Sequence, residues 1–134
     1  MSKVTVVGAG FVGATVAQYL ADREIADVCL VDVVEGMPQG KSLDMMQAAA
    51  ITGHDCEVVG SNDYAATKGS DIVVITAGIA RKPGMSRDEL LKINANIVQG
   101  VAKEAIKYSP DAIFITVSNP LDVMTYLTWK TTKL

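Results

Sequence analysis

Short runs of apolar residues alternate with segments of helical periodicity along the whole chain, and this alternation restricts the folds open to it. Five runs consist mostly of Val, Ile, Leu and similar residues: 4–7, 28–34, 57–59, 72–75 and 112–117. A strand that is apolar at successive positions buries both faces, which is typical of a parallel sheet covered by helices. The sequence therefore predicts an α/β fold with a doubly wound parallel sheet and right-handed crossovers.

The segments between the runs supply the helices. We predict them at residues 12–20, 38–51, 87–105 and 120–129. Pro38 and Pro120 suit the first position of a helix, where the missing N–H costs nothing. Ser86 and Glu89 form an S-x-x-E capping box before the longest helix.

Five strands are one fewer than a complete doubly wound fold contains. The length of 134 residues suits one domain. We therefore expect a single domain over residues 1–134 that is truncated at its C-terminus, with the sixth strand and a substrate domain absent. Cys29 and Cys56 follow no C-x-x-C spacing, so we expect two small buried hydrophobic residues.

A glycine motif directly follows the first predicted strand. Residues 8–13 read Gly-Ala-Gly-Phe-Val-Gly, a G-x-G-x-x-G between a strand and a helix. Gly8 permits a tight turn, Gly10 lets a pyrophosphate approach the backbone, and Gly13 lets the helix pack closely. The free N–H groups of the helix start then face the phosphates. The motif predicts a Rossmann-type dinucleotide site that includes Ala9, Phe11 and Val12, the alternative being a glycine turn without a ligand.

Asp32 stands 19 residues after Gly13 (32 − 13 = 19), at the end of the second predicted strand. A carboxylate there can accept hydrogen bonds from both ribose hydroxyls and repels a 2′-phosphate, which favours NAD over NADP. The alternative is an aspartate that only ends a strand. FAD-binding domains share this fingerprint, so these residues alone leave the choice of cofactor open.

The fourth and fifth predicted strands end in polar or small residues, where ligands of such folds lie. Gly78 would allow close approach of the cofactor. Asn119 could contact the nicotinamide ribose or the substrate, or cap the following helix, and the two roles need not exclude each other. Residues 81–87 carry three cations and no anion in a chain of net charge −3. We expect a mobile substrate loop at about 79–88, although a solvated basic loop is equally compatible with the pattern.

Four segments resemble the NAD-dependent malate dehydrogenases of the branch similar to lactate dehydrogenase: GAGFVG at 8–13, LVDVVEGMPQGKSLDM at 30–45, TAGIARKPGMSRDELLKINANIV at 76–98 and SNPLDVMTY at 118–126. The resemblance implies NAD as the cofactor. It implies that Arg81 binds the second carboxylate of malate or oxaloacetate and that Arg87 polarises the reacting carbonyl. It implies cofactor contacts for Asn94 and for Val117, Ser118 and Asn119, with Asn119 also a substrate ligand.

The resemblance also implies residues that this chain lacks. The proton-transferring histidine of the family, its aspartate partner and a further substrate-binding arginine belong to a second half, so we expect no catalytic residue here. The only histidine is His54. It precedes the third predicted strand, at the edge of the sheet opposite the ligands, and we expect a surface loop residue.

These features predict an oxidoreductase that transfers a hydride between NAD and malate or oxaloacetate, of which the chain alone is inactive. A lactate dehydrogenase-like enzyme and a non-catalytic NAD-binding module are the alternatives. The negative net charge argues against a nucleic-acid partner. No apolar run is long enough for a membrane span and no metal site is apparent, so we expect a cytoplasmic protein. The resemblance implies a homo-oligomer, a dimer or a tetramer.

Overall fold

The computed structural model describes all of residues 1–134. Strands and helices alternate as the sequence predicts, and one short 3₁₀ helix that it does not predict follows the third strand. In chain order the elements are β1 (Lys3–Val7), α1 (Phe11–Asp22), β2 (Asp27–Val31), α2 (Met37–Thr52), β3 (Val58–Ser61), the 3₁₀ helix η1 (Tyr64–Thr67), β4 (Ile72–Ile75), α3 (Arg87–Tyr108), β5 (Ile113–Thr116) and α4 (Leu121–Thr132).

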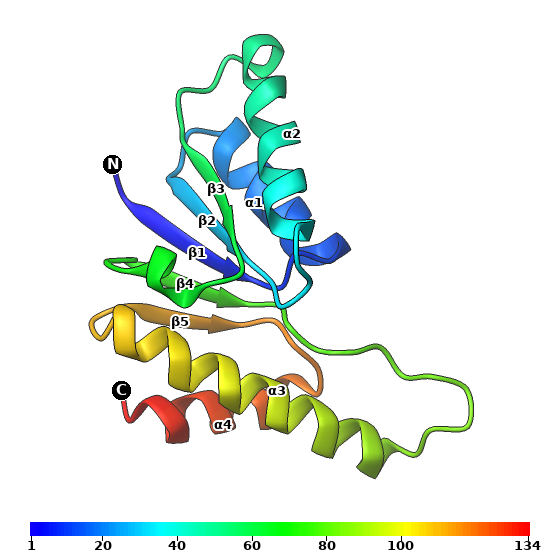
Figure 1. Ribbon diagram of the computed structural model, residues 1–134. Coiled ribbons are helices and arrows are strands. Elements are labelled where there is room, and N and C mark those ends of the chain that lie inside the picture. Colours follow the sequence, from blue (N-terminus) through cyan, green and yellow to red (C-terminus); the bar gives the residue numbers. More distant parts are fainter.

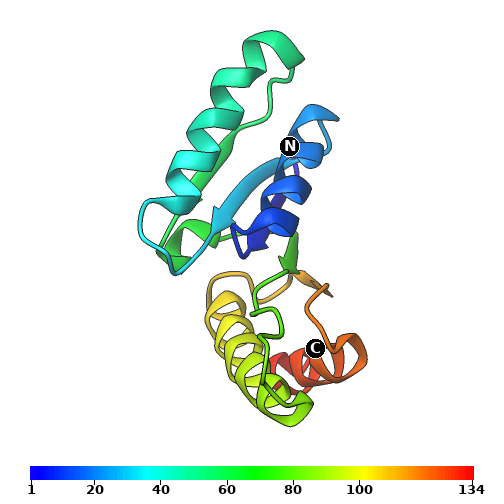
Figure 2. The same ribbon diagram turned by 90° about the vertical axis from the view of Figure 1, so that its right-hand side faces the viewer.

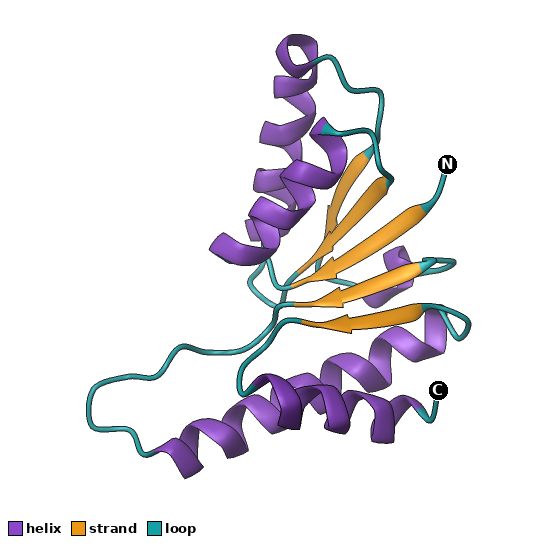
Figure 3. Cartoon of the chain, turned by 180° about the vertical axis from the view of Figure 1, so that it is seen from behind, coloured by secondary structure: helices purple, strands orange, loops and turns teal.

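The five strands form one parallel sheet in the order β3-β2-β1-β4-β5. The chain builds outward from β1 to β3 and then returns through η1 to place β4 on the other side of β1. The strand order therefore reverses between β1 and β4. The carboxyl ends of the strands share one edge of the sheet, from which the long loop between β4 and α3 leaves (Figure 1; Figure 3). Ligands of doubly wound folds bind outside this edge, at the reversal.

Alternate side chains of the central strands enter two separate cores. Val6 and Val74 pack with α1 and α2 on one face of the sheet. Val7 and Ile75 pack with α3 and α4 on the other. Figure 2 shows the two pairs of helices on opposite sides of the sheet. Because both faces are buried, the strands are apolar at consecutive positions, and the predicted doubly wound fold is confirmed.

The second strand ends earlier than its apolar run predicts. The run 28–34 suggested a strand throughout, but β2 ends before Asp32. The Asp32 carboxylate accepts hydrogen bonds from the amides of Ala9 (2.6 Å) and Val34 (2.9 Å), which turn the chain away from the sheet. Val33 is consequently 91% exposed although it is apolar. The remaining elements begin and end within a few residues of the prediction, as is usual for element boundaries.

The outer strand β5 pairs only with β4 and is one edge of the sheet. Both of its isoleucines, Ile113 and Ile115, are exposed. The sheet therefore has an open apolar edge beside α4, as the five-strand count predicts. No helix of the structure is both long and apolar enough to cross a bilayer.

Candidate cofactor and substrate site

The glycine turn joins β1 to α1 at the carboxyl edge of the sheet. A Cβ at Gly13 would lie 1.7 Å from the carbonyl oxygen of Gly8, so the helix can approach the turn this closely only without a side chain there. Gly8 has φ of +106° and would also collide with Thr76. The packing of the chain itself therefore requires glycine at both positions.

Gly10 differs, because a Cβ there would meet nothing within 4 Å. The space outside it is open. The amides of Gly10, Phe11 and Val12 also donate no hydrogen bond within the chain, since no residue precedes them in a helical turn. A bare backbone with free N–H groups at a helix N-terminus fits the pyrophosphate of a dinucleotide.

Three neighbouring side chains fix the turn in this shape. The amide of Ala9 donates to Asp32, and its carbonyl accepts a hydrogen bond from the ammonium of Lys41 on α2. Thr76 at the end of β4 donates from its hydroxyl to the carbonyls of Val7 (3.0 Å) and Gly8 (3.2 Å). Ala9 is fully buried, and its amide and carbonyl are bonded to Asp32 and Lys41, so Ala9 shapes the turn rather than contacting a ligand. Sequence reasoning missed Lys41 and Thr76, because neither belongs to the glycine motif.

A cavity of about 350 Å³ lies beside the turn. Seven of the residues predicted for the site line it: Val12, Gly78, Arg81, Asn94, Val117, Ser118 and Asn119. Two further lining residues, Ile79 and Ala80, begin the predicted loop at 79–88. The sequence analysis did not predict the remaining three, Thr76, Ala77 and Leu90. The fold thus brings together residues that lie far apart in the sequence. The volume is in the range of small-molecule sites.

Asn94 holds one wall of the cavity together. Its side chain is 3% exposed and accepts from the amide of Ile79 at 2.8 Å. It donates to the carbonyls of Ile79 and Asn119. Gly78, with φ of +153°, passes so close that a Cβ would lie 3.2 Å from the Asn94 amide oxygen. Asn94 therefore joins the base of the long loop to the segment that follows β5.

The segment after β5 is fixed to the end of β4. The hydroxyl of Ser118 donates to the carbonyl of Ala77 at 2.5 Å, and the amide of Val117 donates to Ile75. The alternative role of Asn119 as a helix cap is wrong, because α4 begins at Leu121 and has no side-chain cap. Asn119 instead lines the cavity beside the glycine turn.

The basic loop extends away from the body of the domain (Figure 1). The guanidinium of Arg81 donates from Nε to the carbonyl of Met85 and also contributes to the cavity wall. Arg87 is the first residue of α3 and lies inside the predicted capping box of Ser86 and Glu89, which is confirmed. Arg87 is exposed and does not line the cavity. The loop is thus open in this structure, with only one of its two arginines at the site.

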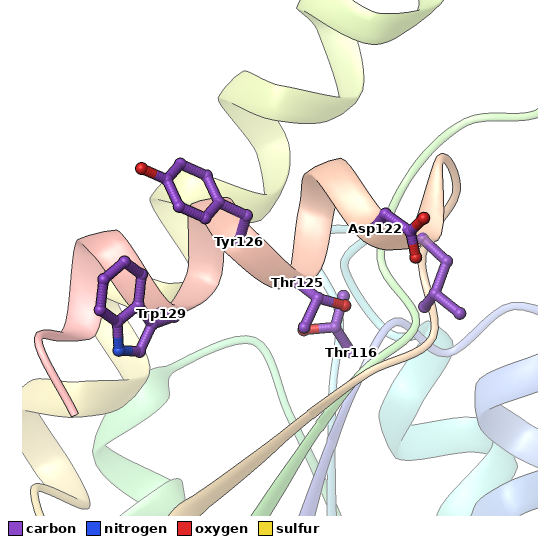
Figure 4. Close-up of a pocket in the computed structure, with 6 residues that line it drawn as sticks. Thr116, Asp122, Thr125, Tyr126 and Trp129 are labelled. Atoms are coloured by element: carbon purple, nitrogen blue, oxygen red, sulfur yellow. The ribbon is translucent and has the colours of Figure 1, made fainter.

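A second hollow lies between β5 and α4, on the side of the open edge. Tyr126 and Trp129 border it, with ring centroids 5.6 Å apart, together with Thr116, Asp122 and Thr125 (Figure 4). It contains no cation and none of the residues predicted for the site. This hollow therefore does not suit an anionic cofactor or substrate.

His54 corrects one expectation. It lies before β3, at the edge opposite the cavity as predicted, but it is 5% exposed rather than a surface residue. Burial alternates from His54 through Cys56 to Val58, so the segment leading into β3 turns every second side chain inward. Neither ring nitrogen of His54 has a hydrogen-bond partner. The interpretation of Cys56 is confirmed: it is buried and free, and burial raises the pKa of its thiol.

The reversal point, the bare glycine turn and the adjoining cavity define a dinucleotide-binding domain. Residues 2–134 match the family model described as the lactate/malate dehydrogenase NAD-binding domain. The chain therefore belongs to the lactate/malate dehydrogenase family, and residues 2–134 match its NAD-binding domain.

Relatives and solved structures agree with this assignment. A malate dehydrogenase of Nostoc punctiforme is 60% identical over the whole chain, which covers 41% of that protein. The malate dehydrogenase structure from Salinibacter ruber has a TM-score of 0.92 and 48% identity, covering 98% of this chain and 41% of that one. The Archaeoglobus fulgidus malate dehydrogenase in complex with NADH has a TM-score of 0.93 and 41% identity, covering 98% and 45%. The chain spans about two fifths of the length of these relatives.

Proposed function

We propose that the chain is the cofactor-binding part, residues 1–134, of an NAD-dependent malate dehydrogenase. The whole enzyme transfers a hydride between C2 of malate and the nicotinamide of NAD. The observation that carries this proposal is the cavity beside the glycine turn, because Arg81 of the loop contributes to its wall. A guanidinium at that position matches a carboxylate in bidentate geometry.

Different residues of the domain bind different parts of the cofactor and of the substrate. Backbone N–H groups from Gly10 to Val12 hold the pyrophosphate, and Asp32 holds the adenine-side ribose. The wall formed by Gly78 and by residues 117–119 receives the nicotinamide ribose, with Asn119 also reaching the substrate. Arg81 and Arg87 bind the substrate when the loop at 79–88 closes. The histidine that exchanges the proton belongs to the remaining part of the enzyme.

Two alternatives differ at defined points. A lactate dehydrogenase-like enzyme would have no use for Arg81, because the methyl end of pyruvate needs no cation. A non-catalytic NAD-binding module would use the glycine turn but not the loop arginines. We further propose a cytoplasmic homo-oligomer, a dimer or a tetramer, for the whole protein.

The test of the function is the kcat/KM of the full-length protein for oxaloacetate and for pyruvate, with NADH. We expect oxaloacetate to be preferred by at least about 100-fold, since pyruvate would leave the Arg81 guanidinium unpaired in the closed site, and loss of one partner of a buried pair costs about 3–5 kcal/mol. A preference for pyruvate would establish the lactate dehydrogenase-like alternative. NADH binding without turnover of either substrate would establish the non-catalytic one.

The position of Asp32 predicts the choice between cofactors. In the full-length protein, NADH should bind more tightly than NADPH, because the carboxylate repels a 2′-phosphate. Asp32→Ser should narrow the difference by about tenfold or more, the equivalent of ~1.4 kcal/mol, measured by calorimetric titration of both cofactors. Asp27→Ser is the matched control, because Asp27 also accepts a backbone amide but at the other end of β2. If both variants keep the wild-type ratio, Asp32 does not face the 2′ position.

A further inference from the structure

The turn that receives the pyrophosphate carries a negative charge of its own. Asp32 accepts the amide of Ala9 at 2.6 Å, which places a carboxylate against the glycine motif. The first turn of α1 contains no charged residue of either sign. The helix dipole supplies only about half a positive charge there. A further cation near this turn would therefore strengthen the attraction of a diphosphate, which carries two negative charges.

Lys41 is the cation in position to supply it. Its ammonium donates a hydrogen bond to the carbonyl of Ala9, whereas Asp32 accepts from the amide of the same residue. It also lies over the ring of Phe11, 5.9 Å from the centroid. Phe11 is 94% exposed. No other Lys or Arg donates a hydrogen bond to residues 8–13.

The hydrogen bond also acts on the donor that faces the ligand. The carbonyl of Ala9 and the amide of Gly10 belong to one peptide group, which is planar. A cation on the carbonyl therefore fixes the direction of the Gly10 N–H and polarises it, making it a stronger donor. That N–H is free, and the space outside Gly10 is open.

We propose that Lys41 is a pyrophosphate-binding determinant of the NAD site. It orients the Ala9–Gly10 peptide so that the Gly10 N–H faces the diphosphate. Its ammonium also offsets the charge of Asp32 and attracts the diphosphate. This role concerns the NAD site and is independent of which hydroxy acid the enzyme uses.

The experiment compares three ligands on the full-length wild-type, Lys41→Met and Lys41→Arg proteins by calorimetry. Lys41→Met keeps the apolar stem but removes the charge. We expect it to weaken NADH and ADP-ribose by about 10- to 100-fold, while adenosine, which has no phosphate, changes less than twofold. Its NADH affinity should also fall less steeply as salt is added. Lys41→Arg should retain most of the affinity, and the control Lys103→Met, on the exposed face of α3, all of it.

Two results would overturn the proposal. Lys41→Met could bind ADP-ribose within twofold of the wild type. Alternatively, it could lose adenosine as strongly as ADP-ribose, which would place Lys41 elsewhere in the site or in the fold. Hydrogen exchange of the ligand-free proteins gives a second readout. Because the Gly10 amide is free and open to solvent, and because a cation on the carbonyl of its peptide group makes the N–H more acidic, its exchange should be slower in Lys41→Met than in Lys41→Arg. Equal exchange in the two would exclude the polarisation of this N–H by residue 41. Failure of the full-length protein to reduce oxaloacetate would leave these results unchanged.

Discussion

Arg81→Gln in the full-length protein is expected to shift the substrate preference from oxaloacetate towards pyruvate, while the affinity for NADH changes little. Oxaloacetate has a second carboxylate and pyruvate does not. Removing the cation leaves that carboxylate buried without a partner, which costs about 3–5 kcal/mol. The ratio of kcat/KM for the two substrates should therefore fall by about two to four decades.

The structure explains why the effect should be selective. Arg81 contributes to the cavity wall from the loop that leaves β4, whereas the glycine turn and Asp32 are built from β1, β2 and α1. In the open loop the guanidinium is bound only to the carbonyl of Met85, so no element of the core depends on it. The substitution should leave the fold and the cofactor half of the site intact.

Lys82→Gln is the matched control, because Lys82 is the next residue of the same loop and also exposed. We expect it to change the substrate ratio less than about threefold, the scale of a surface charge. Initial rates with both substrates and a titration of NADH check the two variants. An unchanged ratio in Arg81→Gln, or an equal change in Lys82→Gln, would place Arg81 outside the substrate site.

The 134-residue chain alone is expected to show no measurable malate dehydrogenase activity, even if it binds NADH. Reduction of oxaloacetate needs a proton donor with a pKa near the working pH, which is usually histidine. The single histidine, His54, is buried before β3 at the edge opposite the cavity. Loss of a general acid costs typically 10²–10⁴ in rate. The absence of the second wall of the cleft should reduce the rate further, because water enters the site and the substrate is poorly positioned.

The open edge of the sheet adds a stability cost. β5 presents unpaired backbone groups and exposed isoleucines, and Tyr126 and Trp129 of α4 are exposed nearby. Such a surface favours association between copies.

The predicted lack of activity is checked by NADH oxidation with oxaloacetate, measured on the purified chain of verified mass and on its His54→Ala variant. Turnover at this length that His54→Ala abolishes would contradict the placement of the site at the carboxyl edge.

Sequence periodicity was sufficient to predict the fold because each strand and each helix has a recognisable pattern in its own residues. The central strands, buried on both faces, are apolar at nearly every position, and the longest helix begins at the capping box of Ser86 and Glu89 that the sequence predicts. The prediction was wrong at two places, where a local contact or the register of a segment, not the hydrophobic pattern, determines the structure. The carboxylate of Asp32 ended β2 before two further valines, and the register of the segment leading into β3 buried His54.

Site residues that belong to a sequence motif could be predicted, whereas site residues that are brought together only by the tertiary structure could not. Gly10 and Asp32 follow from spacing alone. The roles of Thr76, Lys41 and Asn94 in holding the turn and the cavity wall depend on which strand ends and helices become neighbours. For Lys41, the available signal was a lone cation early in the helix that follows Asp32.

Hydrogen exchange of the full-length protein with and without NADH tests most directly that the carboxyl edge of this domain is the cofactor site. Bound cofactor should slow exchange at the glycine turn 8–13, at residues 32–34 and 76–79, and at 117–119. The segment 53–58 and the exposed face of α4 should be unaffected. Protection centred on those two regions, with none at the glycine turn, would contradict the account.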